Sequence, residues 1–154
     1  DTIAIEARRA LARGLQVCVH AIGDAGNALA LDAFEQARNQ DARAVRDDVR
    51  TRIDFRIEHV QVLHPQDVSR LAQLGVIASM QPIHATSDME MADRYWGSRA
   101  DYAYNWRLQL EAGPPPALGG DAPLDPLGAL PNIHAAAPRG RLDGGPGLAP
   151  GSAF

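Results

Sequence analysis

The sequence predicts an α/β fold made of parallel (β/α) units. Short apolar runs alternate with amphipathic stretches, and the order helix then strand recurs four times along the chain. A polar side chain suited to metal binding stands at or next to the end of three of the apolar runs. Strands that alternate with helices pair in parallel through right-handed crossovers. Four such units are half of a closed eight-stranded barrel.

Two strands and three helices are expected in the first half of the chain. A helix over 3–13 ends at Gly14, and a compact apolar run over 15–21 predicts a buried strand. Asp24 can cap a helix over 25–38, and the polar stretch 39–52 is a helix end and loop. A second strand follows over 54–61. His64 can then cap a helix that starts at Pro65 and runs to Gly75.

The second half continues the alternation and then loses it. A third strand is expected over 76–80, a helix over 101–112 and a short strand over 116–119. Between them, 82–100 has no clear period, so we expect a long loop, which would be functional or lid-like. After Pro131 the pattern fades. We therefore divide the chain into a half-barrel domain, 1–134, and a flexible tail rich in Gly and Pro, 135–154.

Composition and charge exclude several classes of partner. The chain has 154 residues and a net charge of −4, without a basic stripe, so nucleic acid is not expected as a partner. No apolar run approaches the roughly 20 residues needed to span a bilayer, so no membrane is expected either. Cys18 is the single cysteine, and we expect it to be a buried small hydrophobe. The helix-like start has no leader and resembles the middle of a protein, which favours the cytoplasm.

His20, His59 and Asp121 are the candidate metal ligands. Each lies where an apolar run meets a loop, and parallel strands bring such ends to one rim of a barrel. Two imidazoles and a carboxylate can hold a divalent metal. The alternative is structural: histidines satisfied by hydrogen bonds at the rim, and an aspartate in a turn.

His84, just after the third strand, could bind substrate or stabilise an oxyanion, or it could be a loop histidine in water. Asp24 is expected to be structural, as a helix cap or a partner of His20. Glu58 should face away from His59 by strand alternation, and we expect an ion pair with Arg56.

The remaining motifs add little. Four aromatic residues are more often expected in the core than in a substrate pocket. They are Tyr95, Trp96, Tyr104 and Trp106. The glycines over 113–120 lack the Lys-Ser/Thr ending of a phosphate loop. No Gly-x-Ser-x-Gly elbow is present in the sequence.

Four segments together resemble a known family. Residues 14–24, 56–65, 75–88 and 118–123 are similar, in this order, to the motifs of the fifth to eighth strands of amidohydrolase family 3. This group of the amidohydrolase superfamily includes N-substituted formamide deformylase-like proteins. The similarity spans about residues 3–130.

The resemblance implies strands 5 to 8 of a (β/α)8 barrel that binds one or two divalent metals, usually zinc. It implies hydrolysis of amide or other C–N bonds, apart from peptide bonds, by metal-activated hydroxide. His20 and His59 match the family's metal-binding histidines, and Asp121 matches the aspartate that touches the metal and shuttles the proton. His84 matches a histidine near the substrate, which would be a small amide-type molecule.

The chain also departs from the family pattern. The His-x-His pair of the first strand and the lysine of the fourth are absent, and Gly120 stands where the family usually has Ser. We therefore expect a carboxyl-terminal half barrel, a fragment that is impaired alone. It should form a homo-oligomer or pair with a missing half barrel, because its edge strands are open. Two alternatives remain: a non-catalytic, self-associating module with vestigial ligands, and a metal-dependent deaminase.

Overall fold

A parallel sheet of four strands forms the centre of the molecule. The computed structural model describes residues 2–41, 55–113, 115–125 and 127–145. The strands are β1 (Cys18–Ala21), β2 (Arg56–His59), β3 (Ile77–Met80) and β4 (Ala117–Leu118), and they lie side by side in chain order. Ala21 is opposite His59, and Met80 is opposite Leu118. All carboxyl ends therefore lie at the same edge of the sheet.

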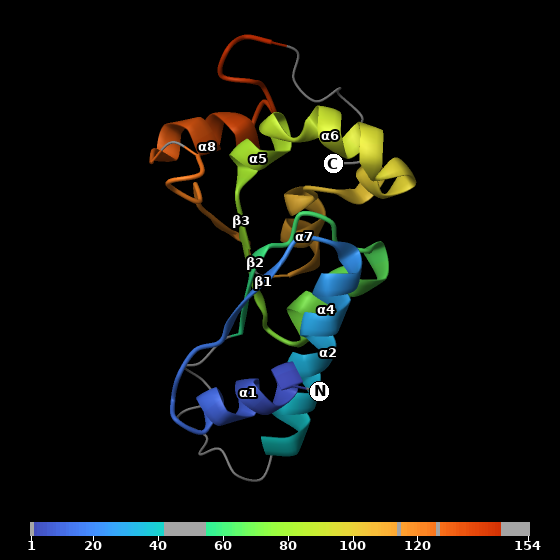
Figure 1. Ribbon diagram of the computed structural model, residues 1–154, viewed down its shortest axis with the longest axis vertical. Coiled ribbons are helices and arrows are strands. Elements are labelled where there is room, and N and C mark those ends of the chain that lie inside the picture. Colours follow the sequence, from blue (N-terminus) through green and yellow to red (C-terminus); the bar gives the residue numbers. More distant parts are fainter. Residues whose placement is uncertain (1, 42–54, 114, 126, 146–154) are drawn as a thin grey trace.

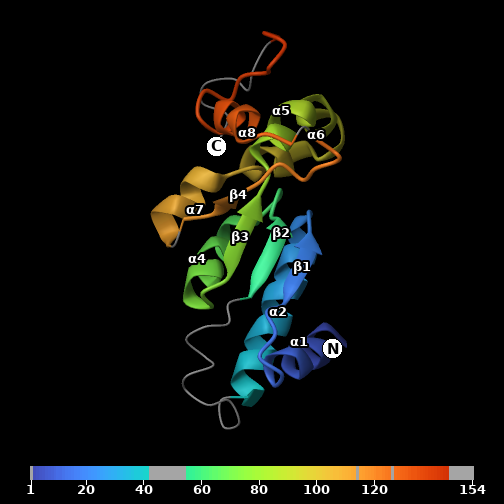
Figure 2. The ribbon, with the colours of Figure 1, turned by 90° about the vertical axis from the view of Figure 1, so that its left-hand side faces the viewer.

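Helices pack on one face of this sheet. The helices α2 (Asp24–Asp41), α4 (Pro65–Gln73) and α7 (Trp106–Ala112) lie on the same side of the strands (Figure 1). The opposite face is turned toward the viewer in Figure 2, with the strands in front of the helices. The helix α1 (Thr2–Leu11) packs against α2 at the far end from the strand tips. The result is a layer of helices on a layer of strands, and no described residues form a second layer on the other sheet face.

The hydrophobic core lies between the sheet and its helices. Phe34 of α2 stacks on Phe55, with ring centroids 4.1 Å apart, and both are almost fully buried. Ile57 and Ala78 point into the same layer from β2 and β3. Strand alternation sends Arg56 and Glu58 to the other face, where they form the predicted ion pair.

Several local predictions are confirmed. The helix α4 begins at Pro65, and His64 caps it by accepting a hydrogen bond from the backbone N–H of Gln66 at Nδ1 (3.3 Å). Gly14 has a φ of 72°, a conformation that favours glycine, at the point where the turn after α1 ends. The stretch 39–52, predicted as a helix end and loop, begins with the last turn of α2, which runs to Asp41, and its remainder lies outside the described residues.

The prediction for the run 15–21 is wrong in one respect. It forms a strand only over Cys18–Ala21, and this strand is not buried: Cys18 and His20 are exposed, and Leu15 is 57% exposed. The reason is that β1 is the outermost of the described strands, with β2 as its one neighbour among them and with no described layer on its second face. A continuous apolar run identifies a strand of a parallel sheet, but it does not reveal whether the layer on the second face is present.

The expectation of a long loop over 82–100 is wrong as well. Residues 82–102 form three short helices: α5 (Pro82–Ser87), α6 (Met89–Tyr95) and the 3-10 helix η1 (Gly97–Tyr102). Each is too short to show a 3.6-residue period. The helix predicted over 101–112 is shorter, because Asn105 caps it and α7 begins at Trp106.

A last helix, α8 (Ala129–Ala136), occupies the region where the sequence pattern fades. It packs against α5 and crosses the boundary that we placed at residue 134. Part of the predicted tail, 146–154, lies outside the described residues.

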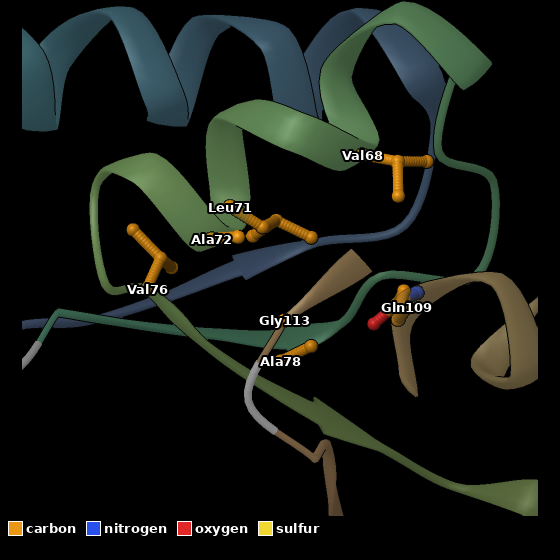
Figure 3. A pocket seen from close by; sticks show the side chains of 7 residues that line it. All are labelled: Val68, Leu71, Ala72, Val76, Ala78, Gln109 and Gly113. Atoms are coloured by element: carbon orange, nitrogen blue, oxygen red, sulfur yellow. The ribbon is translucent and has the colours of Figure 1, made fainter. Parts of the chain in front are cut away.

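A small cavity lies between α4, β3 and α7 (Figure 3). Its volume is about 10 Å³, and its lining is largely apolar, with Val68, Leu71 and Ala78 among the residues. The same contact between α4 and α7 is close: a Cβ atom on Gly113 would lie 2.6 Å from Cβ of Ala72. This cavity could take about one water molecule and is far too small for a substrate.

No helix within the described parts of the chain combines the length and apolar character needed for a membrane crossing.

Candidate metal centre

Three histidines and an aspartate converge at the carboxyl edge of the sheet. His20 lies in β1, His59 ends β2, His84 lies in α5 directly after β3, and Asp121 follows β4. The ring centroids of His20 and His59 are 4.4 Å apart, and those of His59 and His84 are 5.6 Å apart. Nε2 of His84 lies 3.9 Å from Oδ2 of Asp121. One side chain from each strand end therefore contributes to a single cluster.

The backbone around this cluster is unusual. His59, Val60 and Asp121 have φ values of 77°, 47° and 53°. Positive φ is tolerated by Asp but is rare for a β-branched residue such as Val. The segment is held in place because N–H of Val60 donates to the carbonyl of Ala21, and N–H of Val62 donates to that of Ile22. A positive φ at such residues costs energy and often occurs at functional sites. The hydrogen bonds between the ends of β1 and β2 hold this backbone in place and thereby fix the direction of the His59 side chain.

His59 is the buried member of the cluster. The residue is 7% exposed, and its Nδ1 atom has no hydrogen-bond partner among the described residues. Burial, followed by the nearby His20, lowers the pKa of His59 below its ordinary value, while Asp121 opposes this shift. The imidazole is thus kept neutral over a wider pH range, and a neutral imidazole is the form that binds a metal.

The structure groups His59, His84 and Asp121 most tightly. Each offers one potential ligand atom, and the three atoms lie within 4.8 Å of one another. The sequence assigned the second imidazole ligand to His20 and a substrate role to His84. The ring of His20 contacts that of His59, and His20 is exposed because β1 is the outermost described strand.

His84 has a further acidic neighbour that the sequence analysis missed. Nε2 of His84 lies 2.8 Å from Oδ2 of Asp125, and the His84 side chain is 12% exposed. Asp125 lies in the same loop as Asp121, four positions later. Its only sequence signal is an Asp-Pro pair, which is typical of a turn and carries no information about what it contacts.

Asp121 lies at the side of an open groove. The groove has a volume of about 670 Å³ and is lined by β4, by the glycines that follow it and by α8. Leu118, Leu127 and Ile133 make much of its surface apolar. A space of this size, beside titratable groups, is in the range of small-molecule sites.

The other predicted residues lie around the cluster. Asp24 begins α2 and accepts hydrogen bonds from the N–H of Ala25 (2.9 Å) and from the hydroxyl of Tyr102 (3.2 Å). Tyr104 is buried: its hydroxyl donates to Asp88 (2.8 Å) and accepts from Gln61 (2.7 Å). Burial raises the pKa of Tyr104, so its hydroxyl stays protonated. Trp106 is also a core residue, and Tyr95 is exposed.

A parallel sheet with a cluster of potential metal ligands at the carboxyl ends of its strands is typical of metal-dependent hydrolases with a barrel fold. The sequence profile of the amidohydrolase family matches residues 2–152, and the chain belongs to this family.

Two curated proteins are similar in sequence. Protein LONG AFTER FAR-RED 3 of Arabidopsis thaliana is 37% identical over 128 residues, which are 82% of this chain and 21% of that protein. Putative amidohydrolase YtcJ of Bacillus subtilis is 30% identical over 137 residues, 88% of this chain and 24% of that protein. The chain therefore spans about a quarter or less of the length of these relatives.

Two solved structures are similar in fold. An uncharacterized metal-dependent hydrolase from Pyrococcus furiosus matches with a TM-score of 0.74 and 30% identity, over 99% of this chain and 28% of that one. An uncharacterized metal-dependent hydrolase from Pyrococcus horikoshii OT3 matches with a TM-score of 0.64 and 29% identity, over 86% of this chain and 26% of that one.

Proposed function

We propose that this chain is part of a metal-dependent hydrolase that cleaves amide or other C–N bonds in small molecules, apart from peptide bonds. The single observation that carries the proposal is the convergence of His59, His84 and Asp121, whose potential ligand atoms lie within 4.8 Å of one another at the carboxyl ends of parallel strands, with the ring of His20 against that of His59. Catalytic groups of barrel enzymes occupy this edge. Family membership and the two similar structures, both of metal-dependent hydrolases, support the hydrolase part of this proposal.

The residues present fit a divalent metal, and zinc is the metal that we propose. Imidazoles with a carboxylate are a typical zinc donor set, and the buried Nδ1 of His59 has no partner among the described residues. His20, His59 and Asp121 would hold the ion. A bound divalent metal polarises the substrate carbonyl and lowers the pKa of a water molecule to ~7.

The protein's own groups would then handle substrate and protons. Asp121 is placed to accept a proton and pass it to the leaving nitrogen. His84, 3.9 Å from Asp121, would bind the substrate beside it. The apolar groove that Asp121 adjoins suits the acyl or amine substituent of a small amide.

We further propose that β1 to β4 are strands 5 to 8 of a (β/α)8 barrel of the N-substituted formamide deformylase-like type, with 1–134 as the half barrel and 135–154 as a tail. Within the described residues, β1 and β4 have open edges and one sheet face is uncovered, which suits completion by a missing half barrel or by a second copy of this chain.

The test combines metal content with hydrolysis. The chain would be purified, loaded with Zn²⁺ and assayed by elemental analysis and with N-formyl and N-acyl amides, alone and with the amino-terminal half of a relative. We expect His59→Ala to reduce Zn²⁺ affinity by more than about 10-fold, since loss even of a group that only supports a ligand costs that much. His134→Ala, an exposed histidine of α8, is the matched control. Full activity of a metal-free chain would contradict the mechanism.

A self-associating module without catalysis is the second candidate, and the surface of the 117–136 region favours it. Leu118, Leu124, Leu127 and Leu130 are 49%, 80%, 93% and 78% exposed. Sedimentation of the wild type and of Leu127→Glu separates the two candidates. A homodimer that takes up no Zn²⁺ and hydrolyses none of these amides, that Leu127→Glu dissociates and that persists in His20→Ala and His59→Ala, supports the module and contradicts the hydrolase.

A further inference from the structure

Two segments with positive φ values are bonded to each other beside the candidate metal centre. His59 has a φ of 77°, and Tyr104 has a φ of 53°. The backbone N–H of Tyr104 donates to the carbonyl of Gln61. Val62 forms an antiparallel bridge with Ala103. A positive φ is an outlier for a bulky residue and persists only where the surrounding structure holds it. The backbone after His59 and the backbone at Tyr104 therefore hold each other in place.

The hydroxyl of Tyr104 extends this contact to the helix that carries His84. It accepts a hydrogen bond from Nε2 of Gln61 (2.7 Å) and donates one to Oδ2 of Asp88 (2.8 Å). Asp88 directly follows α5, which continues from the end of β3 (Figure 1). Its backbone N–H donates to the carbonyl of His84 (2.9 Å). Hydrogen bonds thus run without a break from the segment after His59 to His84 itself.

Burial makes these hydrogen bonds costly to lose. Gln61 is 4% exposed and Tyr104 is 2% exposed. A buried polar group that loses its partner pays the full cost of its desolvation, because water does not replace that partner. The hydroxyl of Tyr104 is acceptor and donor at once, so removal of this one group breaks the bonds to both Gln61 and Asp88.

We propose that Tyr104 is a positioning residue, whose hydroxyl fixes the segment after His59 against the helix that carries His84 and thereby sets the spacing of the two imidazoles. Their rings are stacked, with centroids 5.6 Å apart and an interplanar angle of 13°. The pairing of β2 with β3 ends at Glu58 and Ser79, before either histidine, so the sheet alone does not fix this spacing. The inference rests on the proposed function for its meaning at a metal site, whereas the hydrogen bonds themselves do not.

The first test is amide hydrogen exchange in the full chain without metal. In Tyr104→Phe, which keeps the ring and removes the hydroxyl, the N–H of Val62 should exchange about 10-fold faster, as expected for the loss of one ordinary hydrogen bond. The N–H of Ile77, which donates to the carbonyl of Phe55 at the opposite end of the sheet (2.9 Å), should change less. Val76→Ala, at a buried position beside Ile77, should show the reverse pattern.

Zn²⁺ titration by calorimetry gives a second readout. Tyr104→Phe should lower the affinity for Zn²⁺ by about 10-fold, the size of change that groups supporting a ligand produce. Tyr95→Phe removes the hydroxyl of a tyrosine that is 65% exposed and should bind Zn²⁺ as the wild type does. Val76→Ala, measured at a temperature where every variant is folded, should also keep the wild-type affinity. This last comparison separates positioning from a general loss of stability.

Variants of Asp88 test the same link from its other end. Asp88→Ala removes the acceptor and should weaken Zn²⁺ binding as Tyr104→Phe does. Asp88→Asn keeps an acceptor oxygen for the tyrosine hydroxyl and should bind Zn²⁺ nearly as the wild type does. Tyr104→Phe combined with Asp88→Ala should lose little more affinity than either change alone, because both break the same hydrogen bond.

The outcomes separate this inference from the proposed function. In a chain that binds Zn²⁺, an unchanged affinity of Tyr104→Phe overturns the role of Tyr104, as does an equal rise in exchange at Val62 and Ile77. A wild-type chain that takes up no Zn²⁺ overturns the proposed function, and the exchange pattern then still decides whether Tyr104 fixes the two segments together.

Discussion

The region α2–β2–α4–β3 buries its apolar side chains, whereas the region β4–α8 leaves several of them exposed. In the first, Leu31, Phe34 and Ile57 have no measurable exposure. In the second, Leu127 is 93% exposed and Leu124 is 80% exposed. The first region has the architecture of a finished layer of helices on strands, and the second presents apolar surface without a cover among the described residues.

This difference matters because the candidate site belongs to both regions. His59 comes from the finished layer and is buried, whereas Asp121 comes from the open one and adjoins the groove. The His59 side of the candidate site is thus part of the packed layer, and the Asp121 side adjoins the groove beside β4 and α8. We expect stability to depend on the first region and association to depend on the second.

The largest expected effect is on the packed layer. Phe34→Ala removes a fully buried ring that stacks on Phe55 and should lower the free energy of unfolding by about 3–5 kcal/mol. Urea denaturation measures the change. Leu127→Ala, at a 93% exposed position, should stay within about 0.5 kcal/mol of the wild type. Equal effects of the two substitutions would show that the difference between the regions is not real.

A smaller effect is expected where α7 meets α4. In Gly113→Ala, the new methyl group would lie 2.6 Å from Cβ of Ala72, so one of the helices must shift. Overpacking of this kind costs about 1–3 kcal/mol, measurable by thermal or urea unfolding. Gly23→Ala is the control, since a Cβ at Gly23 has no atom within 4 Å. A neutral Gly113→Ala would mean that α7 is not tightly docked on α4.

The smallest expected effect is on the pH dependence of stability. Because the pKa of His59 is lowered by folding, the unfolded chain takes up this proton first as the pH falls below about 6.5. Stability should therefore fall on acidification from pH 7.5 to 5.5, and less so in His59→Gln. Urea titrations at both pH values measure the difference. An unchanged pH dependence in His59→Gln would contradict a buried, neutral His59.

The accuracy of the sequence predictions follows the range of the interactions involved. The alternation of strands and helices and the cap at His64 depend on residues within a few positions of each other, and they are visible in the pattern. The helices α5, α6 and α8 escaped because each is about two turns or less. The burial of Cys18 was wrong because it depends on whether a second layer covers β1.

The sequence by itself determined which residues stand at the strand ends, because residue type and apolar runs are local properties. It thereby singled out His20, His59, His84 and Asp121, and it explains Glu58 beside Arg56. Only the tertiary structure decided how these groups are arranged: the exposure of His20, the burial of the His59 ring with no partner for its Nδ1 among the described residues, and the contact of Asp125 with His84. The direction of His59 depends on its positive φ, and the contact of Asp125 with His84 accompanies the packing of α8 against α5, two helices far apart along the chain.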